Sequence, residues 1–140
     1  MSKQRYNLMD VLKTLKICYK RTGDYKGRSG RKEYWTHFIF FVSIFVISIY
    51  LAINVHEGFL FLAFGFPLLN IFTSLALFIR RLHDLNLPAW ILIFPAFLNF
   101  IGSMFEAPAI NLIVLVCMQI LCLMPGTKGK NNYGKVHKIK

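Results

Sequence analysis

Four long apolar runs that contain no Lys, Arg, Asp or Glu constrain this chain more than any other feature of its sequence. The runs cover residues 35–55, 58–79, 88–105 and 108–124. At 1.5 Å per residue, a helix over the first run reaches about 31 Å, which matches a bilayer hydrocarbon core of about 30 Å. We therefore expect an all-α integral membrane protein with four transmembrane helices, preceded by a basic arm (1–34) and followed by a basic tail (125–140).

The last two runs are the shortest, with 18 and 17 residues. They lie at the short end of the spanning range, so a re-entrant hairpin formed by both is a competing interpretation. Pro88 and Pro108 fit the first turn of a helix, where the missing N–H costs nothing. Pro67 and Pro95 lie deeper in their runs and are expected to kink their helices.

Positive charge is separated from the apolar runs along the chain. All 17 Lys and Arg lie in the arm, at Arg80 and Arg81, or in the tail, and the formal net charge is +11. Four spans place these three regions on one side of the membrane, while the other side receives only His56, Glu57 and Glu106. The positive-inside rule then predicts that both termini are cytoplasmic.

An amphipathic helix is predicted in the arm, ahead of the first span. Apolar residues recur there at helical spacing beside three lysines: Leu8, Val11, Leu12, Leu15 and Tyr19, with Lys13, Lys16 and Lys20. Such a helix either lies on the inner leaflet or packs on the cytoplasmic ends of the spans, and the pattern fits both. Residues 22–30 then form a polar, Gly-containing linker.

Three polar segments with distinctive residues lie at 25–35, 80–90 and 125–134. The residues that stand out are Gly27, Arg28, Arg31, Glu33, Tyr34 and Trp35, then 80–84 and Trp90, then 125–127, Gly129, Asn131, Tyr133 and Gly134. In order and spacing they resemble the motifs of the bacterial inner-membrane family known as domain of unknown function 805. Tyr25 and residues 86–89 depart from that pattern. The resemblance implies a bacterial inner-membrane location and supplies no activity.

The same three segments are expected to meet as a cytoplasmic cap, because they end on one face of a four-helix bundle. One interpretation is a set of structural ion pairs, in which arginines face Glu33 and Asp84 and fix the helix ends. The other is an anion site for lipid head groups. Its candidate ligands are Arg28, Arg31, Arg80, Arg81, His83 and Asn131.

Catalytic and metal sites are not predicted. His83 is followed directly by Asp84, but neighbours in sequence do not by themselves orient a base. The four histidines show no metal-ligand spacing, and no cofactor motif is present, so we expect neither metal nor cofactor. The three cysteines form no CxxC pair and are expected to be packed thiols: Cys18, Cys117 and Cys122.

The leading functional hypothesis is a non-enzymatic interaction or accessory protein whose Arg-rich cap binds anionic lipid. Membrane lipids are the expected partners, together with a protein partner or further copies of the chain, and no nucleic acid. The alternative is a small transporter or channel subunit that acts as an oligomer, suggested by the two mid-run prolines. The polar residues inside the runs are expected to form hydrogen bonds between helices: Asn70, Asn99, Asn111 and Gln119.

Overall fold

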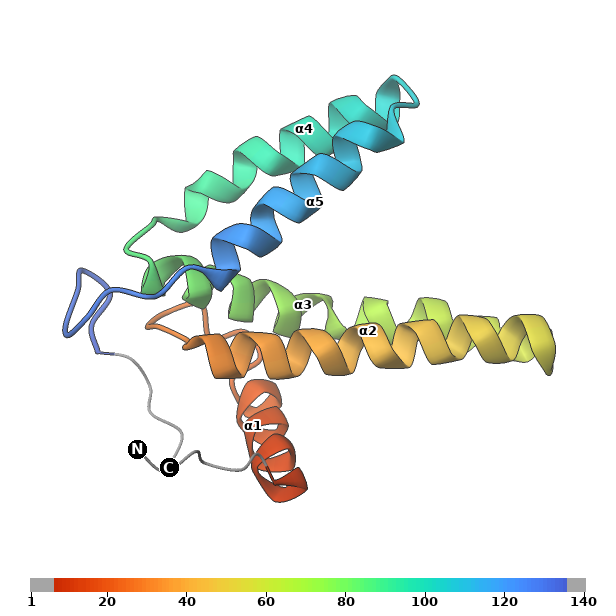
Figure 1. Ribbon diagram of the computed structural model, residues 1–140, viewed down its shortest axis with the longest axis horizontal. Helices are drawn as coiled ribbons and strands as arrows, with labels where there is room; N and C mark the ends of the chain where they lie inside the picture. The colour runs from red at the N-terminus through yellow and green to blue at the C-terminus, as the bar shows by residue number, and fades with distance from the viewer. Residues whose placement is uncertain (1–6, 136–140) are drawn as a thin grey trace. The chain divides into compact units, whose positions relative to one another are not determined.

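The computed structural model describes residues 7–135, and the predicted all-α fold is confirmed there (Figure 1). Its elements are α1 (Leu8–Lys20), α2 (Arg31–Asn54), the 3-10 turn η1 (Glu57–Phe59), α3 (Leu60–Asp84), the 3-10 turn η2 (Ala89–Leu92), α4 (Ile93–Met104) and α5 (Pro108–Leu123). Within the described residues, the only β pairing is an isolated bridge between Asn131 and Gly134. Residues 1–6 of the predicted arm and 136–140 of the predicted tail lie outside the described residues.

Within residues 7–135, two stretches of helix are long and apolar enough to cross a bilayer. They are α2, with 24 residues, and the continuous stretch Glu57–Asp84, with 28 residues. A span needs about 20 residues, so both have length to spare. The stretches Ala89–Met104 and Pro108–Leu123 are also apolar but shorter. The first two predicted spans are therefore matched by helices of sufficient length, whereas four crossings are not established by length alone.

Several predicted boundaries differ from the observed ones. The second run was expected to end at residue 79, yet α3 continues to Asp84. The polar residues that end the apolar run do not end the helix. The expectation that Pro95 kinks the third helix is wrong. Since α4 begins only at Ile93, Pro95 lies in its first turn, where a missing N–H is tolerated. Pro108 opens α5 as predicted.

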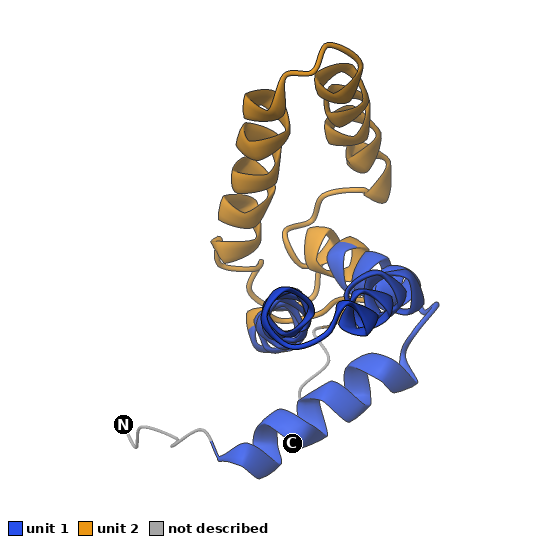
Figure 2. Cartoon of the chain, turned by 90° about the vertical axis from the view of Figure 1, so that its right-hand side faces the viewer, with its two compact units in different colours: residues 1–25, 32–78, 139–140 blue, residues 26–31, 79–138 orange. Residues whose placement is uncertain are grey.

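The described chain divides into two compact units (Figure 2). Unit 1 contains residues 7–25 and 32–78, and unit 2 contains residues 26–31 and 79–135. Helix α3 passes from unit 1 to unit 2 after Phe78.

In unit 1, α2 and the first part of α3 are held together by aromatic contacts. The rings of Phe41 and Phe66 stack with centroids 5.7 Å apart, and those of Tyr34 and Phe78 are 5.9 Å apart. Helix α1 lies crosswise to this pair (Figures 1 and 2). It is anchored by the Tyr19 hydroxyl, which donates to Asn70 Oδ1 at 2.6 Å. The predicted hydrogen bond of Asn70 to another helix is therefore present.

In unit 2, α4 and α5 form an antiparallel hairpin. Its turn is closed by the Ala107 N–H, which donates to the Gly102 carbonyl at 2.7 Å, and Glu106 adopts a positive φ of 50°. A Cβ at Gly102 would overlap the Asn111 side chain, so this glycine lets the two helices approach closely. Cys122 is buried, but Cys117 is exposed, so the prediction of a packed thiol is wrong for Cys117.

Candidate functional site: the arginine cap

The strongest cluster of polar residues lies within unit 2 and is here called the arginine cap. It consists of residues 26–31, residues 80–86 at the end of α3, and residues 124–134 after α5. Three arginines in it are 0–1% exposed, which is unusual for a residue that is always charged. They are Arg28, Arg80 and Arg81. Buried charge requires partners, and each of these arginines donates to an oxygen atom of the cap.

The cap is built around the carboxyl end of α3, which closes with a Schellman motif. Asn86 adopts the left-handed conformation with φ 63°, and its N–H donates to the His83 carbonyl at 3.0 Å. The Leu87 N–H donates to the Leu82 carbonyl at 2.9 Å. This pair of bonds satisfies carbonyls that the last helical turn leaves without an intrahelical donor.

Residues 26–31 and residues 124–134 donate hydrogen bonds to further carbonyls at the carboxyl end of α3. Ser29 N–H donates to the Arg80 carbonyl at 3.1 Å, and Thr127 N–H donates to the Asp84 carbonyl at 2.8 Å. The Asn131 side-chain amide donates to the His83 carbonyl at 2.8 Å. Residues 26–31 and 124–134 are therefore fastened to one helix terminus, although about 100 residues of sequence separate them.

Asp84 is the one carboxylate of the cap and lies between two guanidinium groups. Its Oδ1 accepts from Arg28 Nε at 3.0 Å and from Arg28 Nη2 at 2.9 Å. Its Oδ2 accepts from Arg81 Nη1. Asp84 is 4% exposed, so these charge-assisted bonds form away from bulk water. The cap therefore buries three arginines and one carboxylate, and two of these arginines contact that carboxylate.

Arg28 has no N–H left for a ligand. Besides Asp84, its guanidinium donates to the carbonyls of Thr127 at 2.6 Å, Gly129 at 2.6 Å and Gly134 at 3.1 Å. An arginine carries five N–H donors, and these contacts use all of them. Arg28 thus holds the backbone of the segment after α5 in a fixed shape.

Arg81 performs the same task for the end of α5. Its Nε donates to the Cys122 carbonyl at 3.1 Å, and its Nη2 donates to the Met124 carbonyl. The Arg81 guanidinium is buried beside the Asp84 carboxylate. Because arginine does not deprotonate in proteins, the positive charge is retained at the helix carboxyl end, where the helix dipole favours it.

His83 and Asn131, the other predicted ligands, are also committed to the cap. His83 Nδ1 lies 3.1 Å from the Gly27 carbonyl, which identifies Nδ1 as the protonated nitrogen. The His83 ring stacks on Tyr133 with centroids 3.8 Å apart. Asn131 Oδ1 accepts from the Tyr133 N–H at 2.9 Å. Asp84 meets arginines rather than the His83 ring, so the adjacent pair forms no oriented acid–base couple.

Arg31, Arg80 and Glu33 occupy three different settings. Arg80 is buried, and its Nε donates to Ser29 Oγ at 2.9 Å. Arg31 is exposed. Glu33 belongs to unit 1, where its Oε2 lies 3.8 Å from Arg21 Nη1. Because α2 already begins at Arg31, Glu33 lies in its first turn, and its carbonyl accepts from the Cys18 thiol of α1 at 3.8 Å.

Two functional positions were missed or misread from the sequence. The packing role of Gly126 was not predicted: a Cβ there would overlap the Asp84 carboxylate, so this glycine lets the segment after α5 approach Asp84 closely. Tyr133 was named as a motif residue, but the stacking of its ring on His83 was not predicted. Both residues belong to the motif segment 125–134, and this was the only sign in the sequence that they have a role. Across the described part of the chain, no three His, Cys, Asp or Glu side chains gather as metal ligands.

Comparison with known proteins supports the resemblance noted above. The family described as "Protein of unknown function (DUF805)" matches residues 22–135, which include all three segments of the cap. The chain is 34% identical over 120 residues to "Inner membrane protein YhaI" of Escherichia coli strain K12, covering 82% of this chain and 86% of that protein. The same values hold for the protein of that name from Escherichia coli O157:H7. No solved structure matches. With its apolar helices and this relationship, the chain is a membrane protein that belongs to the DUF805 family.

Proposed function

We propose that the protein is a non-enzymatic, four-span component of a bacterial inner membrane with both termini in the cytoplasm. The absence of Lys, Arg, Asp and Glu from α4 and α5 supports two further crossings by these helices. Four crossings also place all 17 Lys and Arg on one side. The name of the Escherichia coli relatives, inner membrane protein, agrees with this location.

We further propose that the arginine cap is a rigid platform that presents exposed cations to anionic lipid head groups. One observation carries this proposal: the cap divides its cations into two classes. Arg28 and Arg81 are buried and bound to Asp84 and to carbonyls, so they hold the fold together. Arg31 and three lysines are exposed: Lys26, Lys128 and Lys130. Each exposed cation near an anionic surface contributes about 1 kcal/mol of attraction.

This division assigns different roles to arginines that the sequence analysis grouped together as candidate anion ligands. Lipid association belongs to the exposed set, whereas Arg28, Arg80 and Arg81 act as structural cations. The accessory role also agrees with the arrangement of His83, whose Nδ1 is bound to a carbonyl. The alternative of an oligomeric transporter gains no support from Pro95, because that proline opens α4 instead of interrupting it.

The test compares lipid enrichment around two variants in nanodiscs that contain equal amounts of phosphatidylglycerol and phosphatidylethanolamine. The fourfold variant Lys26→Gln/Arg31→Gln/Lys128→Gln/Lys130→Gln is expected to lose enrichment of phosphatidylglycerol while its melting temperature stays unchanged. Arg28→Gln is expected to lower the melting temperature, because it removes one of the two arginine partners of Asp84. Unchanged enrichment in the fourfold variant would refute the lipid platform.

A further inference from the structure

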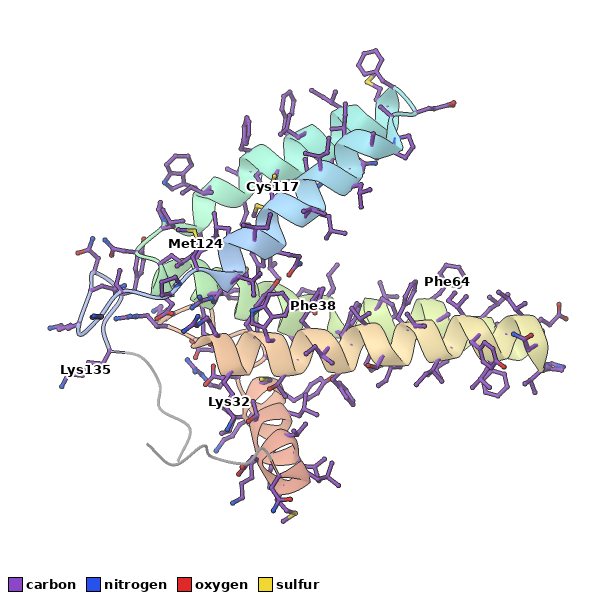
Figure 3. All side chains as sticks on the ribbon, viewed as in Figure 1. Lys32, Phe38, Phe64, Cys117, Met124 and Lys135 are labelled. Atoms are coloured by element: carbon purple, nitrogen blue, oxygen red, sulfur yellow. The ribbon has the colours of Figure 1, made fainter. Side chains whose placement is uncertain are left out.

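A second surface, in unit 1, carries a separate inference. A groove of about 420 Å³ runs between α1 and the first turns of α2. It is lined by Val11 from α1 and by Lys32, Trp35, Thr36, Ile39, Phe40 and Ser43 from α2. Figure 3 shows Lys32 where α1 meets the start of α2. The volume lies within the range of about 300–1,000 Å³ that small-molecule sites occupy.

The lining of the groove is amphipathic along its length. Lys32 lies at the start of α2, and the apolar side chains Ile39 and Phe40 follow two turns further along. A cationic end and an apolar body match the two chemical parts of a phospholipid: a phosphate and an acyl chain. Trp35 adds a hydrogen-bond donor, because its indole N–H is buried and has no hydrogen-bond partner among the described residues.

The surroundings of the groove favour the same occupant. Among the described residues, α2 is one of two helical stretches long and apolar enough to span a bilayer, so the groove lies on a helix suited to contact with lipid. Crosswise to α2, α1 exposes Leu8 and Leu12, which are 71% and 52% exposed. Its next face carries three exposed lysines: Lys13, Lys16 and Lys20. An apolar strip beside a basic strip is the pattern of a helix that lies at an anionic membrane surface.

We propose that this groove binds one anionic glycerophospholipid, with its phosphate at Lys32 and an acyl chain along Ile39 and Phe40. The site goes beyond the proposed platform, because it is in unit 1 and shares no residue with the exposed cations of the arginine cap. It also assigns α1 a role as one wall of a lipid site. The groove holds one lipid molecule per protein chain, whereas the cap attracts a layer of several anionic lipids.

Fluorescence quenching tests the acyl-chain part of the proposal. The chain has two tryptophans, so Trp90→Phe leaves Trp35 as the only one, and Trp90 is 68% exposed and tolerant of change. In this background, phosphatidylglycerol with brominated acyl chains should quench Trp35. Ser43→Phe fills the groove and should raise the lipid concentration for half-quenching about tenfold or more. Val42→Phe is the matched control, because Val42 is exposed on the same helix and does not line the groove.

The head-group part is tested with Lys32→Gln in the same background. The preference for brominated phosphatidylglycerol over brominated phosphatidylcholine should fall about fivefold, the equivalent of losing one cation near a phosphate. Lys26→Gln in the cap should leave this preference unchanged. Equal quenching in Ser43→Phe and Val42→Phe, or no lipid preference in the parent, would overturn the groove. Neither result depends on the fourfold cap variant, so the two proposals fail separately.

Discussion

The arginine cap and helix α1 use positive charge in opposite ways. In the cap, Arg28 and Arg81 are buried and donate to Asp84 and to backbone carbonyls. On α1, the lysines point outward beside exposed apolar residues. The cap turns its charge inward to join segments that are distant in sequence. On α1 the charged side chains are exposed at the surface of the protein.

The choice of residue follows from this difference. A guanidinium has five donors in a planar fork, so a single Arg28 can bind a carboxylate and three carbonyls at once. A lysine ammonium is a compact, strongly hydrated charge, which suits an exposed helix face. The comparison shows that the number of nearby carbonyls, more than the density of charge, decides whether a cation is structural.

Removing the shared carboxylate should produce the largest effect. Asp84→Asn leaves the guanidinium groups of Arg28 and Arg81 buried without a counter-charge. Loss of one partner of a buried ion pair costs about 3–5 kcal/mol. Thermal unfolding in detergent should therefore show a much lower melting temperature. Glu106→Gln, at an exposed carboxylate in the α4–α5 turn of the same unit, should be nearly neutral. A melting temperature equal to that of Glu106→Gln would mean that the cap is not a structural lock.

The next effect should come from keeping the charge but removing the fork. Arg28→Lys preserves the ion pair with Asp84, yet an ammonium cannot reach the carbonyls of Thr127, Gly129 and Gly134 together. A fully buried acceptor left without a donor costs about 1–3 kcal/mol, and because these carbonyls are only part-buried we expect a total of about 2–3 kcal/mol. Arg31→Lys, at an exposed arginine, should change stability by less than about 0.5 kcal/mol. Denaturant unfolding of both variants makes the comparison, and equal midpoints would contradict the structural role of the fork.

Gly126 tests how tightly the cap is packed. A Cβ there would overlap the Asp84 carboxylate, which cannot move aside because Arg28 and Arg81 hold it. Gly126→Ala should therefore cost about 1–3 kcal/mol. Gly65→Ala is the control, because a Cβ at Gly65 inside α3 meets nothing within 4 Å. Replacing glycine in a helix should stabilise slightly. The result to be excluded is a melting temperature that rises equally in both variants.

The fold was largely predictable because hydropathy and charge act over long stretches. The apolar runs located the helices, and the helical spacing of Leu8, Leu12 and Leu15 predicted α1. The end of α3 was placed too early, since charged residues mark the edge of an apolar run and not the end of a helix. Pro95 was misjudged for a related reason: the 3-10 turn that precedes α4 depends on backbone geometry that composition does not encode.

The site was predictable as a gathering of segments but not as a set of contacts. Three motif segments with ends on one face suggested that Arg28 and Asp84 meet. Which arginine stays exposed depends on carbonyl positions, and these follow from the Schellman turn at Asn86 and the loop after α5. The nearness of Glu33 to Arg21 was not predicted either, because it depends on how the end of α1 packs against the start of α2.

The smallest predicted effect concerns the attachment of α1 and has a pH dependence. Tyr19→Phe removes the hydrogen bond to Asn70 and should cost about 0.5–1 kcal/mol, reduced because Tyr19 is 38% exposed. Burial raises the pKa of the Tyr19 phenol above its ordinary value of 10.0. Because the folded state favours the neutral phenol, this stabilisation is present below pH 10 and is lost as the pH rises through the raised pKa.

Limited proteolysis between residues 21 and 30 at pH 8 to 11 measures the release of α1. In the parent protein, cleavage should accelerate above pH 10. The Tyr19 phenolate cannot donate to Asn70 Oδ1, and it is poorly solvated in its half-buried position. Tyr19→Phe should start from a faster rate and show a flatter dependence over the same window. Tyr25→Phe, at an exposed tyrosine of unit 1, should retain the slope of the parent. If Tyr19→Phe shows the same increase of the cleavage rate with pH, the release of α1 at alkaline pH comes from other groups. The Tyr19–Asn70 bond would then not be what holds α1 against α3.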